Sequence, residues 1–245
     1  SNYAGWQKQP NGTAIQQIVQ VALQEMTQAD IKLLASGRTD KGVHALGQVA
    51  TFKTERLIKC SSFLKGLNSL LPSDISIKKV EEVAASFHPI HSAKKKTYCY
   101  LILNSACDSA LLQKRAWHIP QKLDLKQMRK AAKHFKGTHD FTSFMGANSA
   151  IKDAVRKISQ FKIAKLAHAF FGVGPQMEKQ LICITVEGSG FVKYQVRNMV
   201  GTLLNVGLGK NQPSDIAQML ALKNRQATKK RRAPAHGLYL QKVDY

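Results

Sequence analysis

Acidic side chains are scarce in this sequence of 245 residues. Only 15 Asp and Glu stand against 37 Lys and Arg, which gives a formal net charge of +22 at pH 7. Such an excess favours a polyanionic partner, because phosphate groups bind Lys and Arg and release their counterions. RNA and DNA are therefore the leading partner classes. The basic residues are spread through the chain rather than gathered beside an apolar anchor, which disfavours an acidic membrane surface.

Long apolar runs and paired cysteines are lacking as well. No run approaches the roughly 18 apolar residues that cross a bilayer, and no secretory signal pattern opens the chain, so we expect a soluble, cytoplasmic protein. The four cysteines form no CxxC pair, which argues against a zinc ribbon and a dithiol redox site. We expect reduced structural thiols at Cys60, Cys99, Cys107 and Cys183.

What the sequence does contain is a repeated mixture of helices and strands. Apolar residues at helical spacing predict helices over 13–26, 61–71, 125–136, 192–206 and 214–222. Alternating or branched apolar runs predict strands over 31–34, 43–52, 75–83, 97–103, 155–163, 181–187 and 237–243.

The order of these elements indicates an α+β fold. The strands recur at intervals too short for a doubly wound parallel sheet, so antiparallel units fit better. We expect two similar halves of ferredoxin-like type, with largely antiparallel sheets joined around a central cleft. The predicted domains are residues 1–90 and residues 91–245.

The segment SGRTDKGVHALGQ, residues 36–48, is the most informative in the chain. Small and turn-forming residues bracket one anion, Asp40, and its flanking cations Arg38 and Lys41. An Asp in such a loop is usually a turn or capping residue. A loop between two strands is also a common place for reactive groups. The residues alone leave both interpretations open.

This segment, extended to GRTDKGVHALGQVATF, resembles the signature of the tRNA pseudouridine synthase A family. Five further blocks are similar in the family's order: GWQ at 5–7, KKTYCYLI at 95–102, DFTSF at 140–144, GSGFVKYQVRNMVGTLLNVG at 188–207, and APAHGLYLQKVDY at the end. Chance agreement across six ordered blocks that span nearly the whole chain is not expected.

The resemblance implies an isomerase that converts uridine to pseudouridine in the anticodon stem-loop of tRNA, at positions 38 to 40. The reaction breaks the N1–C1′ bond, turns the base and joins C5 to C1′. Nothing is oxidised or reduced, so we expect no cofactor and no metal. Asp40 would be the catalytic carboxylate, acting either as a nucleophile at C1′ or as a base at C2′.

The resemblance also assigns roles to Arg197 and Tyr98. Arg197 would pair with Asp40, lowering the pKa of the carboxyl group and fixing its orientation. The ring of Tyr98 would stack on the uracil, with its hydroxyl near enough for proton transfer. Without the resemblance, Arg197 would be expected to reach solvent from an amphipathic helix. Tyr98 would be expected in the core.

Two further substrate-binding roles and the oligomeric state follow from the same resemblance. Arg38 would fill the space left by an extruded nucleotide or grip the adjacent phosphate. The alternative for Arg38 is phosphate binding without base flipping. Leu238 would contact the other side of the uracil, unless it is an ordinary core position. The family works as a homodimer, so a homodimer is expected here.

Other polar features carry less weight. His44 lies within the signature, yet nothing marks it as an acid or a base. His88 and His91 have HxxH spacing, but Pro89 argues against a helix that would align them on a metal. The stretch 223–232 packs six basic residues into ten. It is either a solvated loop or a phosphate-contacting edge, and periodicity does not decide between them.

Two other functions compete with the leading one. A catalytically silent tRNA-binding module would need only the basic surface, and it gives no reason for an acidic residue in a basic cleft. A pseudouridine synthase with a different RNA target would carry the same catalytic residues.

Overall fold

A computed structural model describes residues 2–10, 12–146, 153–166, 180–225 and 232–245. The chain divides into two compact units. Unit 1 comprises residues 1–43, 47–93 and 245, and unit 2 comprises residues 44–46 and 94–244. The chain thus leaves unit 1 for three residues within the segment 36–48. Residues 226–231 of the basic stretch lie outside the described residues.

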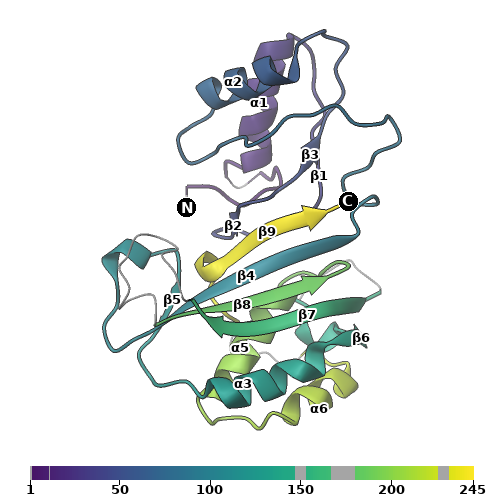
Figure 1. Ribbon diagram of the computed structural model, residues 1–245. Coiled ribbons are helices and arrows are strands. Elements are labelled where there is room, and N and C mark those ends of the chain that lie inside the picture. Colours follow the sequence, from purple (N-terminus) through teal and green to yellow (C-terminus); the bar gives the residue numbers. More distant parts are fainter. Residues whose placement is uncertain (1, 11, 147–152, 167–179, 226–231) are drawn as a thin grey trace. The chain divides into compact units, whose positions relative to one another are not determined.

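Unit 1 consists of two helices and a small antiparallel sheet (Figure 1). Helices α1 (Ile15–Thr27) and α2 (Cys60–Leu70) confirm the predicted helices over 13–26 and 61–71. Strands β1 (Leu34–Ala35) and β3 (Ala50–Thr51) pair with each other. Ala35 of β1 and Ala50 of β3 pack against a core that the helices and nearby segments bury: Trp6, Val19, Ala22, Leu23, Ile31, Leu33, Phe63, Leu67 and Leu71.

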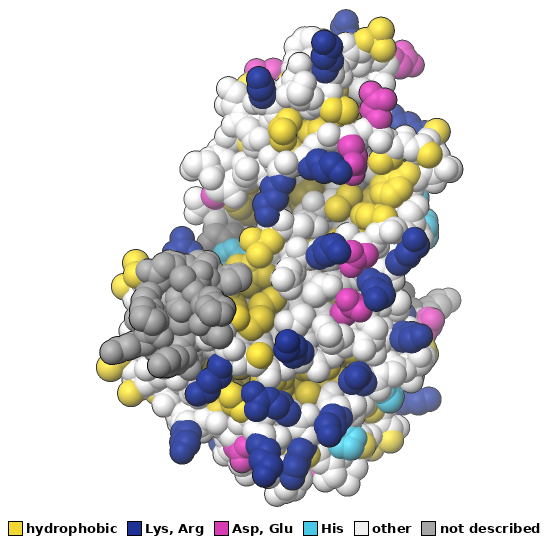
Figure 2. All heavy atoms as spheres, in the orientation of Figure 1, with side chains coloured by type: hydrophobic (Ala, Val, Ile, Leu, Met, Phe, Trp, Pro, Cys, Tyr) yellow, Lys and Arg dark blue, Asp and Glu magenta, His cyan; other side chains and the backbone are white. Residues whose placement is uncertain are grey.

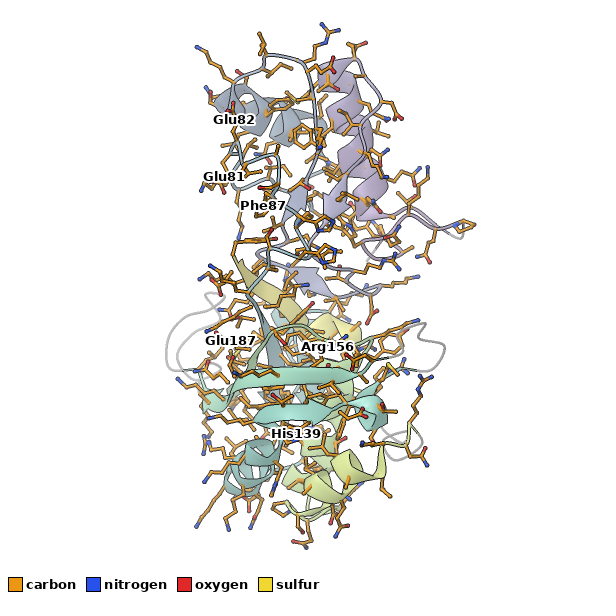
Figure 3. All side chains as sticks on the ribbon, turned by 90° about the vertical axis from the view of Figure 1, so that its right-hand side faces the viewer. Glu81, Glu82, Phe87, His139, Arg156 and Glu187 are labelled. Atoms are coloured by element: carbon orange, nitrogen blue, oxygen red, sulfur yellow. A yellow bond between two sulfur atoms is a disulfide. The ribbon has the colours of Figure 1, made fainter. Side chains whose placement is uncertain are left out.

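The predicted strand over 75–83 is wrong, because this segment of unit 1 forms no strand. The amide group of Asn68 accepts a hydrogen bond from Ile77 N at 2.7 Å and donates one to Ile77 O at 2.9 Å. A side chain therefore satisfies the backbone groups that a neighbouring strand would otherwise satisfy. Ile77 packs against the core, whereas Glu81 and Glu82 are exposed (Figure 3).

Unit 2 is built on a larger mixed sheet (Figure 1). Its strand order is β2 (His44–Ala45), β9 (Leu238–Asp244), β4 (Lys95–Asn104), β8 (Leu181–Gly188), β7 (Val155–Lys165) and β6 (Gly137–Asp140). These neighbours are antiparallel except β2 and β9, which are parallel. Strand β5 (Trp117–Ile119) adds to β4 in parallel. The fold is α+β, as predicted.

The predicted strand over 43–52 is wrong as one continuous element. Residues 44–45 pair with β9 in the sheet of unit 2, whereas residues 50–51 pair with β1 in unit 1. The segment therefore serves two sheets. Strands β5 and β6, which are short and lack strict apolar alternation, were not predicted.

Helices α3 (Leu125–Ala132), α5 (Gln195–Gly207) and α6 (Asp215–Leu222) lie on one side of the sheet of unit 2 (Figure 1). Asp124 caps α3, accepting bonds from the backbone N–H groups of Lys126 and Gln127. Short 3-10 turns cover Ala110–Leu112, Lys133–Phe135, Thr142–Phe144 and Ala235–Gly237. The sheet buries alternate residues toward these helices, namely Tyr100, Ile102, Ile182, Ile184 and Val186.

The opposite face of the sheet carries a second apolar cluster, formed by Cys99, Leu101, Leu103, Leu112, Ala116, Leu181 and Tyr239. In this face the sulfur atoms of Cys99 of β4 and Cys183 of β8 lie next to each other. Cys60 and Cys107 are free. Strand pairing brings together two cysteines that are 84 residues apart in the sequence. Among the described residues, no helix combines the length and the apolarity that crossing a membrane requires.

Candidate active site

Asp40 lies in a loop of unit 1 whose main chain is held at three points. Asp40 forms an antiparallel bridge with Gly5. Trp6 N donates to Thr39 O at 3.1 Å, and Val43 N donates to Asp40 O at 3.0 Å. Hydrogen bonds on both sides of Asp40 therefore fix the backbone from which its carboxylate projects.

Gly5 is required by its close approach to this loop. Its φ is +106°, and a Cβ there would lie 2.7 Å from Thr39 O and 3.1 Å from Lys41 N. Only glycine combines this backbone conformation with this contact. The GWQ block, far from the signature in the sequence, therefore serves as the support of the Asp40 loop.

Gln48 holds the start of the same loop. The hydroxyl of Ser36 donates to Gln48 Oε1 at 2.7 Å, and Gln48 Nε2 donates to Gly37 O at 2.9 Å. Val49 N donates to the same Oε1 at 3.2 Å. The last residue of the SGRTDKGVHALGQ segment thus closes the loop on its first two residues.

The loop alternates between buried and exposed side chains. Thr39 is buried, Asp40 is half-buried, and Arg38 and Lys41 are exposed. The single carboxylate is therefore presented between two cations that are accessible to solvent. This arrangement suits a reaction on a nucleotide, whose phosphates the cations attract.

Tyr98 lies on β4 in unit 2 and faces the helical side of the sheet. In the strand register it stands opposite Leu240 of β9 and Val186 of β8. Its ring meets Phe191 edge to face, with centroids 5.1 Å apart. Tyr98 is half-buried, whereas Tyr100, two residues further along the same face, is fully buried. The partial exposure leaves part of the Tyr98 ring accessible to a ligand.

Arg197 lies in the first turn of α5 and is held by the segment before β9. Its Nε donates to Ala233 O at 2.8 Å, and Ala233 N donates to Arg197 O at 3.1 Å. The guanidinium lies over the ring of Tyr194, 5.2 Å from its centroid. Arg197 is half-buried. These contacts hold the side chain within unit 2 rather than leaving it extended into solvent.

The DFTSF block positions the helix that carries Arg197. Asp140 accepts bonds from Thr142 N at 2.9 Å and Thr142 Oγ1 at 2.6 Å, and the Thr142 hydroxyl holds the pKa of the Asp140 carboxyl below its usual value. The turn that follows presents Phe144 O, which accepts a bond of 2.7 Å from the buried amide of Asn198. Asn198 is the residue after Arg197, so this block fixes the first turn of α5.

Leu238 begins β9 and is 6% exposed. It stands opposite Tyr100 in the register, so it shares the face that carries Tyr98 and Tyr100. The hydroxyl of Tyr100 donates to Pro234 O at 2.8 Å, and burial raises the pKa of this phenol above its usual value. The segment that leads into Leu238 is therefore fixed to the same strand as Tyr98.

Unit 2 thus holds Tyr98, Arg197 and Leu238 on one side of its sheet, while Arg38 and Asp40 lie in unit 1. Each group has a chemistry suited to its expected role: an aromatic face, a fixed cation, an apolar side chain and a carboxylate. The pairing of Arg197 with Asp40 would involve both units and stays a prediction.

Sequence reasoning missed the surroundings of Tyr194. Lys193, Arg197 and Arg232 all lie over its ring, at 5.1, 5.2 and 3.8 Å from the centroid. The aromatic residue beside a lysine in KYQVR was the only signal, and Arg232 is remote in the sequence. Lys and Arg side chains are also spread over the visible strands and helix of unit 2, with few acidic ones among them (Figure 2).

His88 and His91 contact each other rather than a common third group. Their rings lie 4.3 Å apart, and His88 Nδ1 accepts a bond of 3.2 Å from Ile90 N. Within the described parts of the chain, no group of three or more His, Cys, Asp or Glu side chains is arranged to hold a metal ion. The two rings therefore pack against each other in this loop.

Comparison with known proteins adds an independent line of evidence. A family model described as tRNA pseudouridine synthase matches residues 1–91 and 131–245. Three similar proteins carry the name tRNA pseudouridine synthase A. They come from Geotalea uraniireducens (42% identical), Thermodesulfovibrio yellowstonii (41%) and Acetivibrio thermocellus (41%). Each similarity covers the whole of this chain and 95% of the relative.

Proposed function

Because this chain belongs to the tRNA pseudouridine synthase family, we propose that it isomerises uridines 38 to 40 of the tRNA anticodon stem-loop with Asp40 as catalyst. Family membership makes the chain an isomerase that converts uridine in tRNA into pseudouridine. The choice of tRNA positions and the roles of individual residues are the proposal.

The observation that carries the role of Asp40 is its loop. One half-buried carboxylate stands between two exposed cations, on a main chain fixed by Gly5, Trp6 and Val43. A reacting group must be held in place, since a displacement of about 1 Å can cost about a hundredfold in rate.

Arg197 is proposed to pair with Asp40 in the complex with tRNA. The Ala233 carbonyl and the Tyr194 ring fix the direction of its guanidinium, which supports a role as an oriented cation. A cation near a carboxylate favours the ionised form, and both proposed actions of Asp40 need that form. Attack on C1′ and removal of the C2′ proton each start from a lone pair on the carboxylate.

Tyr98, Leu238 and Arg38 are proposed to hold the extruded nucleotide. The accessible part of the Tyr98 ring offers a stacking surface worth roughly 1–3 kcal/mol per base. Leu238 would contact the other side of the uracil. Arg38, exposed two residues before Asp40, would occupy the space that the base leaves or bind the adjacent phosphate.

The two actions of Asp40 differ in the bond that breaks. If Asp40 removes the C2′ proton, tRNA deuterated at C2′ of the target uridine should react several-fold more slowly in single turnover. If Asp40 attacks C1′, the C2′–H bond stays intact in that step and the rate should change little.

A homodimer in the cytoplasm completes the proposal. A tRNA is longer than one protomer of this size, and the basic surface of a second protomer would extend the area that contacts its phosphates. Sedimentation velocity with and without tRNA would give the oligomeric state. Fractionation of the source cells would give the compartment.

The proposed function is tested by release of tritium from tRNA labelled at uracil C5, since C5 loses its hydrogen when it bonds to C1′. Asp40→Asn should abolish release and keep tRNA binding. Asp30→Asn, at an exposed acid of the same unit that accepts a bond from Gln24, is the matched control and should stay active. Full activity of Asp40→Asn would refute the role of Asp40. A wild-type protein that binds tRNA without releasing tritium would favour the silent binding module.

A further inference from the structure

Three consecutive carbonyl oxygens of unit 2, those of residues 114–116, are each bound by a side chain from another element. His44 Nε2 lies 2.9 Å from the first, and the hydroxyl of Tyr239 donates to the second at 2.7 Å. His236 donates to the third. A ring nitrogen that contacts a carbonyl oxygen must carry the proton, so His44 is a donor here.

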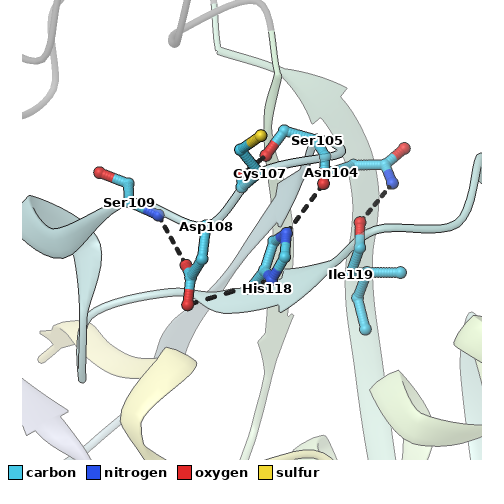
Figure 4. A network of polar contacts seen from close by, with 7 residues as sticks. All are labelled: Asn104, Ser105, Cys107, Asp108, Ser109, His118 and Ile119. Carbon is cyan, nitrogen blue, oxygen red and sulfur yellow. Dashed lines mark hydrogen bonds and ion pairs between the residues drawn. The ribbon is translucent and has the colours of Figure 1, made fainter.

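The segment that His44 binds is itself well fixed. Leu112 and Ala116 are buried in the apolar cluster that also contains Tyr239. At the other end of the loop between β4 and β5, His118 Nε2 contacts Ser105 O at 2.8 Å, and its Nδ1 lies 4.0 Å from Asp108 Oδ2 (Figure 4). The carbonyl that meets His44 therefore belongs to a rigid anchor.

His44 is attached to β9 by its backbone and by its ring. In the parallel pairing of β2 with β9 it stands beside Tyr239, and the two rings stack with centroids 4.7 Å apart and planes 19° apart. Two residues later, Leu46 N donates to Leu240 O at 2.8 Å. His44 thus makes a side-chain hydrogen bond, a stacking contact and a strand pairing at one position.

His44 is also only four residues after Asp40 in the chain. Between them Val43 N closes a turn on Asp40 O, and Gly42 has a φ of +82°. Only this turn of three residues therefore separates His44 from Asp40 along the chain.

We propose that His44 is a positioning residue, which holds the Asp40 loop in its working position through Lys114 O and the ring of Tyr239. The imidazole takes no part in the proton transfers of the reaction. The inference rests on the proposed catalytic role of Asp40. It gives a role to His44, a residue of the segment 36–48 for which the proposed reaction has none.

The competing explanation is that His44 only stabilises the segment 114–116. Tyr239→Phe separates the two explanations. This substitution removes the hydrogen bond to Arg115 O and keeps the ring on which His44 stacks. It therefore weakens the same anchor by one hydrogen bond without releasing β2.

The experiment compares His44→Ala, His44→Gln and Tyr239→Phe by single-turnover tritium release, tRNA binding and thermal unfolding. In His44→Ala the rate constant should fall by about tenfold or more, with tRNA affinity within about twofold of wild type. His44→Gln, whose amide can donate to Lys114 O, should recover most of the rate. Tyr239→Phe should unfold at a lower temperature and react at the wild-type rate.

Two results would overturn the inference: a wild-type rate in His44→Ala, or an equal loss of rate in Tyr239→Phe. If His44→Ala does not fold, His44→Phe takes its place, because it keeps the stacking and removes the donor. A rate in His44→Phe equal to that of His44→Gln would then count against the inference. Failure of the catalytic role of Asp40 is seen separately, as activity in Asp40→Asn.

Discussion

Arg197 and Ala233 are joined by two hydrogen bonds that run in opposite directions. The guanidinium Nε donates to Ala233 O at 2.8 Å, and Ala233 N donates back to the Arg197 carbonyl at 3.1 Å. Such a pair fixes both the backbone and the side chain of the arginine. The residue proposed to hold the catalytic carboxylate in its ionised form is thus oriented before any substrate binds.

Arg197→Lys should keep the charge and lose this orientation, because lysine has no Nε–H in the guanidinium plane. We expect the single-turnover rate to fall about a hundredfold, with tRNA binding retained and a loss of about 1 kcal/mol in stability. Arg129→Lys is the matched control, since Arg129 Nε makes the same kind of bond to Ile163 O at 2.9 Å. Equal rates for the two variants would show that the orientation of Arg197 is unimportant.

Gly5→Ala should destabilise unit 1 and slow the reaction. The new Cβ would meet Thr39 O at 2.7 Å, and the backbone would carry a side chain at a φ of +106°. We expect a loss of about 1–3 kcal/mol in a chemical denaturation experiment. Gly209→Ala shares a positive φ of +71° but has open space around it, so it should lose less and keep its rate. Equal losses would mean that the contact with the Asp40 loop has no effect.

Stability should decrease as the pH falls below about 6.5, with a contribution from His236. Burial, the largest cause, lowers the pKa of His236 in the folded protein, so the unfolded chain takes up its proton first. The contribution is complete above the unfolded pKa of about 6.5 and is lost as the pH falls toward the folded value. Urea unfolding of His236→Gln should show a shallower pH dependence, and an unchanged slope would contradict this.

Arg38→Ala and Lys41→Ala should separate phosphate binding from base flipping. Both side chains are exposed beside Asp40, so each substitution should lower the slope of log Kd against log salt by about 1 if the side chain contacts a phosphate. Only Arg38→Ala should also reduce the single-turnover rate. If both variants turn over at the wild-type rate, Arg38 binds phosphate and has no role in base flipping.

The sequence predicts the helices of this protein well and its short strands poorly. Apolar spacing located α1, α2, α5 and α6 to within a few residues. Helices α1, α2 and α6 each bury one face, whereas α5 is buried on nearly all sides. The segment 75–83 is as rich in apolar residues as a strand, yet it pairs with no strand. The side-chain amide of Asn68 instead binds the backbone N–H and C=O groups of Ile77. A side chain that replaces a strand partner leaves no periodic signal.

For the candidate site, local motifs predicted which residues belong to it, but they did not predict the contacts that hold those residues in place. The bracket of small residues around Asp40 was visible in the sequence, whereas the contact of Gly5 with Thr39 depends on the folded chain. The same holds for the cations around Tyr194, which come from two separate segments. The pairing of β2 with β9 was hidden because two residues are too few to show alternation.

The pairing of His44 with Tyr239 also has a consequence for the order of assembly on the ribosome. The partner strand of β2 is β9 (Leu238–Asp244), so this pairing can form only after the many residues between the two strands have been synthesised. Contacts this distant in sequence form slowly. A nascent chain that ends before β9 would contain Asp40 and lack this pairing, so under the proposed role of His44 the Asp40 loop gains its working position only once β9 has been synthesised.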